Sequence, residues 1–251
     1  MHLRPDGLTL LFWKMATVTN ADGRGVNKRR RSVPSRIARV LVLAVIAFYA
    51  LVASSLLLLR WVDPPTTAVQ IQRRLESLMH RKTWHKFYVF VPAAQISPAL
   101  QHAVVAAEDA RFFQHHGFDW KQVQIAVEDD LDRGKSRGAS TITQQLVKNL
   151  FLTTSRSFIR KGIEFTIVPV AEFLLSKRRI LELYLNVIEW GPGIYGAEAS
   201  ARHYYHVPAE RLTRDQAVEL ASILPAPLRR RPGHLTEYDR IISERMAQMG
   251  W

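Results

Sequence analysis

A glutamate that could act as a base lies in the stretch Ala107–Trp120, which reads A-E-D-A-R-F-F-Q-H-H-G-F-D-W. If this stretch is helical until Gly117 ends it, then Glu108, Phe112 and His115 share one helix face. Bulky aromatic rings beside a carboxylate would desolvate it and raise its pKa towards that of a general base. Taken alone, however, the stretch favours an ordinary amphipathic helix with a solvated Glu-Asp pair.

A second stretch, Gly138–Asn149, carries groups suited to a sugar phosphate and reads G-A-S-T-I-T-Q-Q-L-V-K-N. Ser140 or Thr141 would cap a helix whose amino terminus is a natural anion site. Thr141, Gln145 and Lys148 then place a hydroxyl, an amide and an ammonium group on one face. The alternative is a well-capped surface helix. The neighbouring glutamines Gln144 and Gln145 argue against it, because Glu or Lys would suit an exposed surface better.

Charged residues continue downstream at Arg156, Arg160, Lys161 and Glu164. The spacing of Arg160 and Glu164 also fits a plain surface ion pair, worth about 0.3–0.5 kcal/mol. The next stretch, Lys177–Asn186, carries a stripe of apolar residues at helical spacing, which we interpret as packing.

Secondary-structure elements must position these residues. The apolar periodicity and the helix start and stop signals predict a mainly α-helical domain. Helices are predicted over Ser97–Gly117, Asp119–Arg133, Thr141–Leu150, Phe158–Asn186, Gly193–Tyr205, Asp215–Leu224 and Tyr238–Met249. Pro169 should kink or split the long fourth helix. Phe87–Val91 is the one persuasive strand.

The amino-acid composition excludes several kinds of catalytic and metal site. The chain has 251 residues, of which 47% are hydrophobic, and it has no cysteine. Disulfides, thiolate catalysis and cysteine-ligated zinc are therefore excluded. The histidines are scattered without a set of partners, so no metal site is predicted. The formal net charge is +13, and nine Lys or Arg against two Asp in residues 1–39 supply +7 of it. A basic tail beside an apolar run indicates a membrane surface rather than nucleic acid.

Val40–Leu59 is a run of twenty residues without a charge, close to the ~20 that cross a bilayer as a helix. Basic residues precede it, which places the amino terminus in the cytoplasm and the rest outside. A cleaved signal peptide is the alternative, but no strong cleavage site follows. We therefore expect a tail at 1–39, an anchor at 40–60 and a catalytic domain at 61–251.

A further apolar set is expected either to dip into the outer leaflet or to pack internally: Leu150, Phe151, Leu152, Phe158 and Ile159.

Five stretches, in this order and spacing, resemble the glycosyltransferase domain of class A penicillin-binding proteins and the related peptidoglycan glycosyltransferases. The pattern E-D-x-x-F-x-x-H-x-G is met at Glu108, Asp109, Phe112, His115 and Gly117. G-x-S-T-I-T-Q-Q is met at 138–145, and R-K-x-x-E at 160–164. K-x-x-I-L-E-x-Y-L-N falls at 177–186 and G-x-x-G-x-x-A at 193–199. The resemblance covers residues 64–227. No Ser-x-x-Lys occurs, so a transpeptidase domain is not expected.

The resemblance implies a lysozyme-like helical domain that polymerises lipid II into glycan strands. Glu108 would take the proton from the attacking 4-hydroxyl, the MurNAc anomeric carbon would be inverted, and undecaprenyl pyrophosphate would leave with help from Glu164. Substrate and pyrophosphate would be bound by Lys148, Arg156, Arg160, Lys161, Ser140, Thr141, Gln144, Gln145 and Asn149. Supporting roles fall to Asp109, Phe112, His115 and Gly117.

The resemblance also implies partners and a location. The partners would be lipid II, the growing glycan strand, the membrane and other cell-wall synthesis proteins, with no nucleic acid. No cofactor is required, although a divalent cation could sit on the pyrophosphate. The domain would lie on the periplasmic side of a bacterial inner membrane. Two alternatives stay open, a glycan-cleaving lytic transglycosylase or muramidase and a catalytically idle membrane scaffold.

Overall fold

The computed structural model describes residues 33–81, 83–133, 140–155, 157–233 and 236–251. The chain forms two compact units, Met1–Ile46 and Ala47–Trp251. The helices are α2 (Val33–Leu58), α3 (Ala68–Met79), α4 (Pro98–Glu108), α5 (Trp120–Arg133), α6 (Ile142–Phe151), α7 (Phe158–Leu174), α8 (Lys177–Val187), α9 (Ala197–Tyr205), α10 (Arg214–Ile223) and α11 (Thr236–Gln248). Three short 3-10 turns are η1 (Ala93–Gln95), η2 (Phe112–Gln114) and η3 (Ala209–Arg211).

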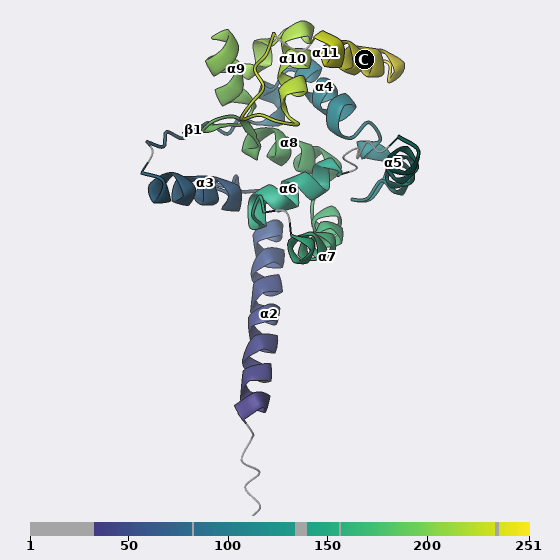
Figure 1. Cartoon of the computed structure of the whole chain (residues 1–251). Helices are drawn as coiled ribbons and strands as arrows, with labels where there is room; N and C mark the ends of the chain where they lie inside the picture. The colour runs from purple at the N-terminus through teal and green to yellow at the C-terminus, as the bar shows by residue number, and fades with distance from the viewer. Residues whose placement is uncertain (1–32, 82, 134–139, 156, 234–235) are drawn as a thin grey trace, which may run out of the picture. The chain divides into compact units, whose positions relative to one another are not determined.

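The second unit is organised around α4. Leu100, Ala103, Val104, Val105 and Ala106 of this helix are all buried, and a helix that is apolar on every side belongs in a core. Helices α10 and α11 pack against α4, while α6 packs against both α7 and α8 (Figure 1). The predicted mainly α-helical class is confirmed, and the arrangement is consistent with a lysozyme-like domain.

Helix α4 ends earlier than the sequence predicted. Its last residue is Glu108, and Asp109 leaves the helix with φ −159° and ψ 71°. The physical reason is that the Asp109 carboxylate accepts a hydrogen bond from the backbone N–H of Ile142, 3.0 Å away, which a helical Asp109 would have to abandon. Phe112 lies in the separate turn η2. Glu108, Phe112 and His115 therefore do not share one helix face, and that prediction was wrong.

The predicted helix over Phe158–Asn186 is two helices, but Pro169 is not the break. Pro169 lies inside α7 on the exposed side, where water can satisfy the carbonyl that a proline leaves unpaired. The chain turns instead at Leu175, which is extended. Ser176 then caps α8 by accepting the N–H of Arg179 at 3.2 Å. The helices predicted within Asp119–Arg133, Thr141–Leu150, Asp215–Leu224 and Tyr238–Met249 are confirmed to within one residue at each end, except that α11 begins two residues early, at Thr236.

A small sheet has the order β1-β3-β2, with β1 (Phe87–Tyr88) parallel to β3 (Ile194–Tyr195) and β2 (Glu189–Gly191) antiparallel to it. The predicted strand Phe87–Val91 is confirmed in its first two residues, and the other two strands were missed. Helix α9 was predicted to open at Gly193, but it begins at Ala197. Gly196 has φ +88°, and a Cβ there would lie 2.6 Å from the carbonyl oxygen of Asn186. The chain therefore makes a glycine turn before the helix.

In the described part of the chain, one helix is long and apolar enough to cross a membrane, the segment Arg36–Leu58 of α2. It overlaps the predicted span Val40–Leu59. Towards its end Val52 and Leu56 are buried in the core of the second unit, as is Leu59 just after it. The predicted boundaries at residues 39 and 60 stay predictions.

Candidate active site

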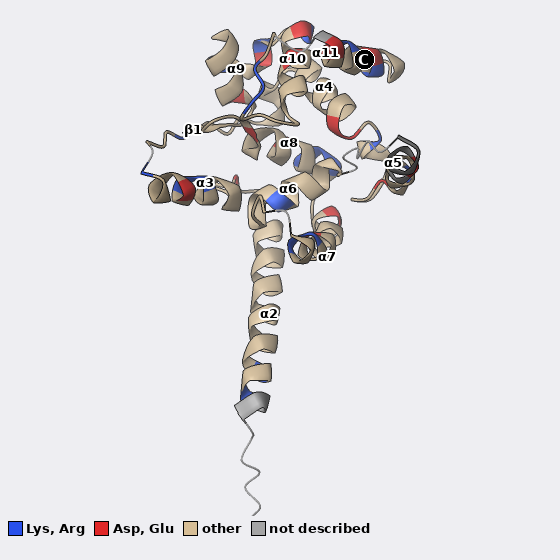
Figure 2. Ribbon diagram, viewed as in Figure 1, with Lys and Arg blue, Asp and Glu red and all other residues tan. Residues whose placement is uncertain are grey.

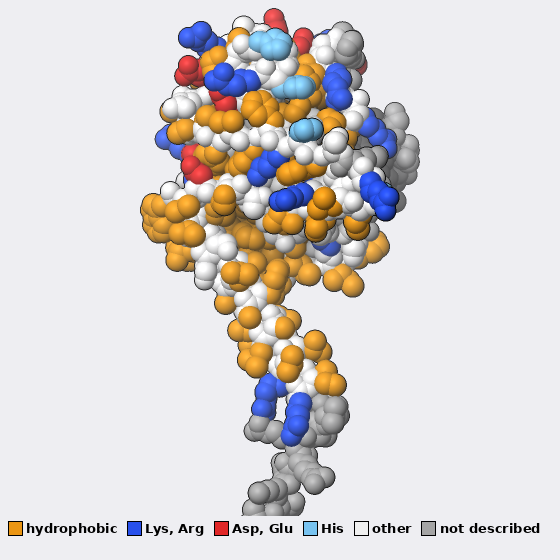
Figure 3. All heavy atoms as spheres, turned by 90° about the vertical axis from the view of Figure 1, so that its left-hand side faces the viewer, with side chains coloured by type: hydrophobic (Ala, Val, Ile, Leu, Met, Phe, Trp, Pro, Cys, Tyr) orange, Lys and Arg blue, Asp and Glu red, His pale blue; other side chains and the backbone are white. Residues whose placement is uncertain are grey.

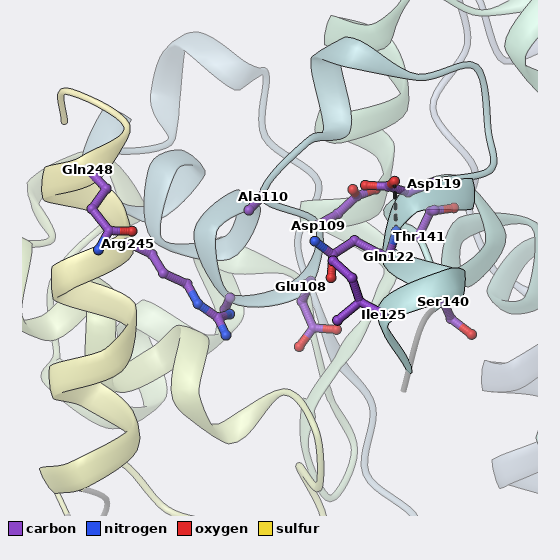
Figure 4. A pocket seen from close by; sticks show the side chains of 11 residues that line it. Glu108, Asp109, Ala110, Asp119, Gln122, Ile125, Ser140, Thr141, Arg245 and Gln248 are labelled. Atoms are coloured by element: carbon purple, nitrogen blue, oxygen red, sulfur yellow. Dashed lines mark hydrogen bonds between the residues drawn. The ribbon is translucent and has the colours of Figure 1, made fainter. Parts of the chain in front are cut away.

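A cavity of about 340 Å³ opens beside Glu108. Figure 4 shows Glu108 between the first turns of α5, on which Gln122 and Ile125 lie, and α11, which carries Arg245 and Gln248. The lining residues are Ala107, Glu108, Asp109, Ala110, Asp119, Gln122, Ile125, Ser140, Thr141, Arg245 and Gln248. The volume falls within the range of about 300–1,000 Å³ that is usual for ligand pockets.

The Glu108 carboxylate has one neutral donor. Its Oε2 accepts a hydrogen bond from Nε2 of Gln145 at 2.6 Å. Burial raises the pKa of Glu108, while the Gln145 bond and the charge of Lys148 oppose the rise and the charge of Asp109 adds to it. Burial is the largest of these effects, so the carboxylate binds a proton more readily than an exposed glutamate does. A base of this kind suits chemistry near neutral pH.

Two hydrogen bonds join the first two motif stretches and thereby hold Glu108 against α6, and a third lies within the first stretch. Asp109 Oδ1 lies 2.9 Å from His115 Nε2, and Asp109 Oδ2 accepts from the Ile142 N–H at 3.0 Å. The Thr141 hydroxyl donates to the carbonyl of Gly117 at 2.7 Å. Gly117 has φ +88°, and a Cβ there would meet a side-chain atom of Val168 at 2.5 Å.

The polar residues of the second motif divide into two groups. Thr141 and Gln144 form a capping box at the start of α6, which commits most of their polar atoms to the helix end. Asn149 donates to the backbone carbonyl of Gln145 at 2.8 Å. Ser140 and Thr141 line the Glu108 cavity, whereas Gln145 and Asn149 line a second cavity. The binding roles of all five stay predictions.

A cluster of charge surrounds the second glutamate. Glu164 of α7 is 2% exposed and forms ion pairs with Arg160 and Lys161. The alternative of a plain surface pair does not apply, because this carboxylate is buried. Figure 2 shows basic residues on α6 and on α7, two helices that pack together. Arg156, the remaining basic residue predicted here, lies outside the described residues.

Lys148 connects the two glutamates electrostatically. Burial lowers the pKa of its ammonium group, and the negative charges of Glu164 and Glu108 oppose that shift. It forms no ion pair with any carboxylate among the described residues. A buried cation without a counter-charge is costly unless an anion binds beside it. Lys148 therefore lies close enough to interact with both the candidate base Glu108 and the charge cluster around Glu164.

The model of the transglycosylase family matches residues 75–249. The chain is 41% identical over 220 residues to a biosynthetic peptidoglycan transglycosylase of Pseudomonas entomophila, covering 86% of this chain and 93% of the relative. A protein of the same description from Brucella suis is 43% identical over 224 residues, covering 86% and 96%. One from Laribacter hongkongensis is 47% identical over 169 residues, covering 67% and 74%. This chain belongs to the transglycosylase family. The predicted family and enzyme class are thus confirmed.

Some residues of this transglycosylase site were missed from sequence. Arg245 and Gln248 of α11 line the Glu108 cavity, and Arg245 donates to the carbonyl of Ala106 at 3.1 Å. Both lie outside every motif stretch and far along the chain, so no local signal marks them. Asp119 was read only as a helix start, yet it accepts from the Arg111 guanidinium at 3.1 Å.

The structure also brings Asp109, His115 and Asp119 together, with potential ligand atoms within 4.8 Å of one another. The sequence analysis found no such partners for His115. Arg111 pairs with Asp119, and His115 bonds to Asp109, while His115 Nδ1 and Asp119 Oδ2 are buried without a hydrogen-bond partner among the described residues. That the transglycosylase needs no metal or other cofactor stays a prediction.

The apolar set beside the charge cluster divides in two. Leu150 and Leu152 are buried, and Phe151 packs against the core. Phe158 is 98% exposed and Ile159 is 78% exposed. The packing alternative therefore holds for the first three, and the last two remain candidates for lipid contact.

Proposed function

We propose that this transglycosylase is a membrane-anchored peptidoglycan glycosyltransferase that polymerises lipid II into glycan strands. Glu108 takes the proton from the 4-hydroxyl of the acceptor GlcNAc. The resulting oxygen nucleophile attacks the anomeric carbon of the terminal MurNAc of the growing chain from the side opposite its leaving group. The carbon is inverted, and undecaprenyl pyrophosphate departs. The relatives' descriptions as peptidoglycan transglycosylases support this substrate class.

The observation that carries the proposal is the environment of Glu108. Its pKa is raised by burial, the neutral amide of Gln145 donates a hydrogen bond to it, and it lines a cavity open to a ligand. A carboxylate that is paired with a cation makes a weak base, because the cation stabilises its charged form. Glu108 is free of such a pair among the described residues and so keeps its basicity.

The charge that develops on the leaving group would fall to the cluster around Glu164. Lys148, Arg160 and Lys161 place positive charge near one another on α6 and α7, and Arg156 of the same motif region would add to it. Fixed cations stabilise a departing pyrophosphate without reorganising during the reaction. Glu164 holds Arg160 and Lys161 in place, so it assists the leaving group through them. This mechanism requires no covalent intermediate, and a divalent cation on the pyrophosphate would reinforce the same charge.

A membrane anchor suits substrates that carry polyprenyl tails. The Tyr49 hydroxyl of α2 lies 2.6 Å from the Thr166 hydroxyl of α7, so α7 lies beside the last turns of the apolar helix. Phe158 at the start of α7 and Phe173 near its end are both exposed. Figure 3 shows hydrophobic side chains dense on the lower part of the domain, at the level of α3 in Figure 1. The basic residues before α2 support the proposal that this domain lies on the periplasmic side of an inner membrane.

The test uses the purified full chain in detergent or nanodiscs with lipid II. Glycan polymers separated by gel electrophoresis, together with release of undecaprenyl pyrophosphate, are the expected result. The same preparation is incubated with isolated sacculi, which a glycan-cleaving enzyme would clear. Clearing of sacculi without polymer formation would overturn the proposal, and so would a folded protein that does neither.

A further inference from the structure

Tyr184 belongs to the stripe of α8 that the sequence suggests is for packing, but its hydroxyl reaches the site. The side chain is 1% exposed, and its Oη donates to Oε1 of Gln145 at 3.0 Å. Nε2 of the same amide donates to Glu108 Oε2 at 2.6 Å. A phenol, an amide and a carboxylate thus form one chain across α8, α6 and α4.

The direction of this chain matters because an amide has one accepting end and one donating end. If the Gln145 amide were reversed, its oxygen would face the Glu108 carboxylate with no proton between them. The Tyr184 phenol opposes that reversal, since it offers a proton to the amide oxygen. Burial raises the pKa of Tyr184 well above its ordinary value, so the phenol keeps this proton at neutral pH.

We propose that Tyr184 is a positioning residue, which holds the Gln145 amide with its nitrogen towards the catalytic Glu108. The inference rests on the proposed function only in that Glu108 is the base. A donor to the carboxylate stabilises its charged form. Tyr184 therefore keeps Glu108 ionised, and ready to accept a proton, at a lower pH than its burial alone would allow.

The variant Tyr184→Phe removes the hydroxyl and keeps the packing. In the full-length protein, the acidic limb of the polymerisation rate should move up by about one pH unit, as expected for a weakened bond to a charged group. On that limb kcat falls about tenfold while KM changes little. The same upward shift should appear in a ¹³C NMR titration of the Glu108 carboxyl carbon without substrate, with the signal assigned by its loss in Glu108→Gln.

The matched control is Tyr195→Phe. Tyr195 is as deeply buried as Tyr184, and its hydroxyl also donates to a side chain, that of Glu189 at 3.3 Å. This variant should lose comparable stability yet keep the wild-type pH profile. A control profile that shifts with that of Tyr184→Phe would overturn the proposal, because the effect would then come from loosened packing.

A double-mutant cycle tests whether Tyr184 acts through Gln145. Gln145→Leu removes the donor, so it should shift the Glu108 titration at least as far as Tyr184→Phe, and adding Tyr184→Phe should shift it no further. Additive shifts, or a Tyr184→Phe titration that overlays the wild type, would overturn the proposal. If the NMR shifts appear but the wild type does not polymerise lipid II, the positioning role stands and the proposed function fails.

Discussion

Two glutamates that both interact electrostatically with Lys148 have different surroundings. Glu108 ends a central apolar helix, and the donor to its carboxylate is a neutral amide. Glu164, on a helix with an exposed apolar face, is paired with two cations. Glu164 is buried, whereas Glu108 lines a cavity and has its pKa raised by desolvation. The partners, rather than burial itself, decide what each carboxylate can do.

The difference assigns the two roles. A carboxylate with a raised pKa accepts a proton and holds it, which a base must do. A carboxylate held between two cations is poorly suited to accept a proton, but it fixes the direction in which those cations point. Breaking each region in turn should therefore produce different kinds of defect.

Glu108→Gln should give the largest effect. The amide keeps the size and much of the hydrogen bonding but cannot accept the proton. General-base catalysis contributes about 10²–10⁴-fold, so the rate of lipid II polymerisation should fall by that factor while lipid II binding survives. Gel-resolved polymer formation and a separate binding measurement check the two halves. Polymerisation near the wild-type rate would show that Glu108 is not the base.

Lys148→Met should come next, and it should damage affinity as well as rate. A phosphate bound beside Lys148 would be left without its counter-charge, and breaking a buried pair by removing one partner typically costs about 3–5 kcal/mol. We expect a fall of about 10²-fold or more in kcat/KM, with a weaker Kd for lipid II. A variant that loses rate and binds normally would place Lys148 with Glu108 instead of with the anion site.

Glu164→Gln should be milder, with a fall of about tenfold, because a neutral amide still orients Arg160 and Lys161 through hydrogen bonds. The defect should lie in kcat for leaving-group departure and should be smaller with a substrate whose leaving group is better. Steady-state rates with lipid II and with an activated donor distinguish these cases. A loss as large as that of Glu108→Gln would mean that the two glutamates share the proton transfer.

The sequence was sufficient to predict features, such as helix caps, that depend on residues close together in the chain. Thr141, one of the two predicted caps, caps α6, and Gln144 completes a capping box with it; Thr213 caps α10. Family motifs then supplied the roles. Local patterns failed where a distant partner decides the backbone: Asp109 leaves α4 because its carboxylate is needed at the start of α6.

The strands Glu189–Gly191 and Ile194–Tyr195 are too short to show a recognisable sequence pattern, and the second of them pairs with a distant segment at Phe87. The apolar residues around α6 and α7 show the same limit. Hydrophobicity alone could not separate Phe151, which packs against the core, from Phe158, which does not. Which side of a helix meets the core follows from the whole fold.

Phe158→Ser tests whether the exposed apolar side chains of α7 contact lipid, in contrast to the pocket at Glu108. Removing one aromatic side chain from the interface should weaken liposome binding by about tenfold or less, since burying it contributes about 1.5–3 kcal/mol when complete. The protein for this test begins before Ala47, because Val52, Leu56 and Leu59 belong to the core. Flotation with liposomes provides the measurement.

Phe151→Ser is the matched control. Phe151 belongs to the same apolar set as Phe158, but its ring packs against the core. It should lower the Tm and leave liposome binding of the folded protein unchanged. A Phe158→Ser variant that loses Tm and keeps its liposome binding would assign Phe158 to packing.

The smallest expected effect is also the most direct contrast, because the two glutamate variants should change stability in opposite directions. The pKa of Glu108 is raised in the folded protein, so its ionisation costs folding stability as pH rises from the ordinary glutamate range through the raised value. Above that value Glu108→Gln removes the cost and should raise the Tm. Below the ordinary range, where Glu108 is protonated, the difference should vanish.

Glu164→Gln leaves Arg160 and Lys161 without a counter-charge and should lower the Tm. A change of about 1 kcal/mol shifts Tm by about 2–4 °C in a domain of this size, which differential scanning fluorimetry across pH resolves. Shifts of the same sign would mean that both carboxylates serve the fold alike, and the division of labour between them would have to be abandoned.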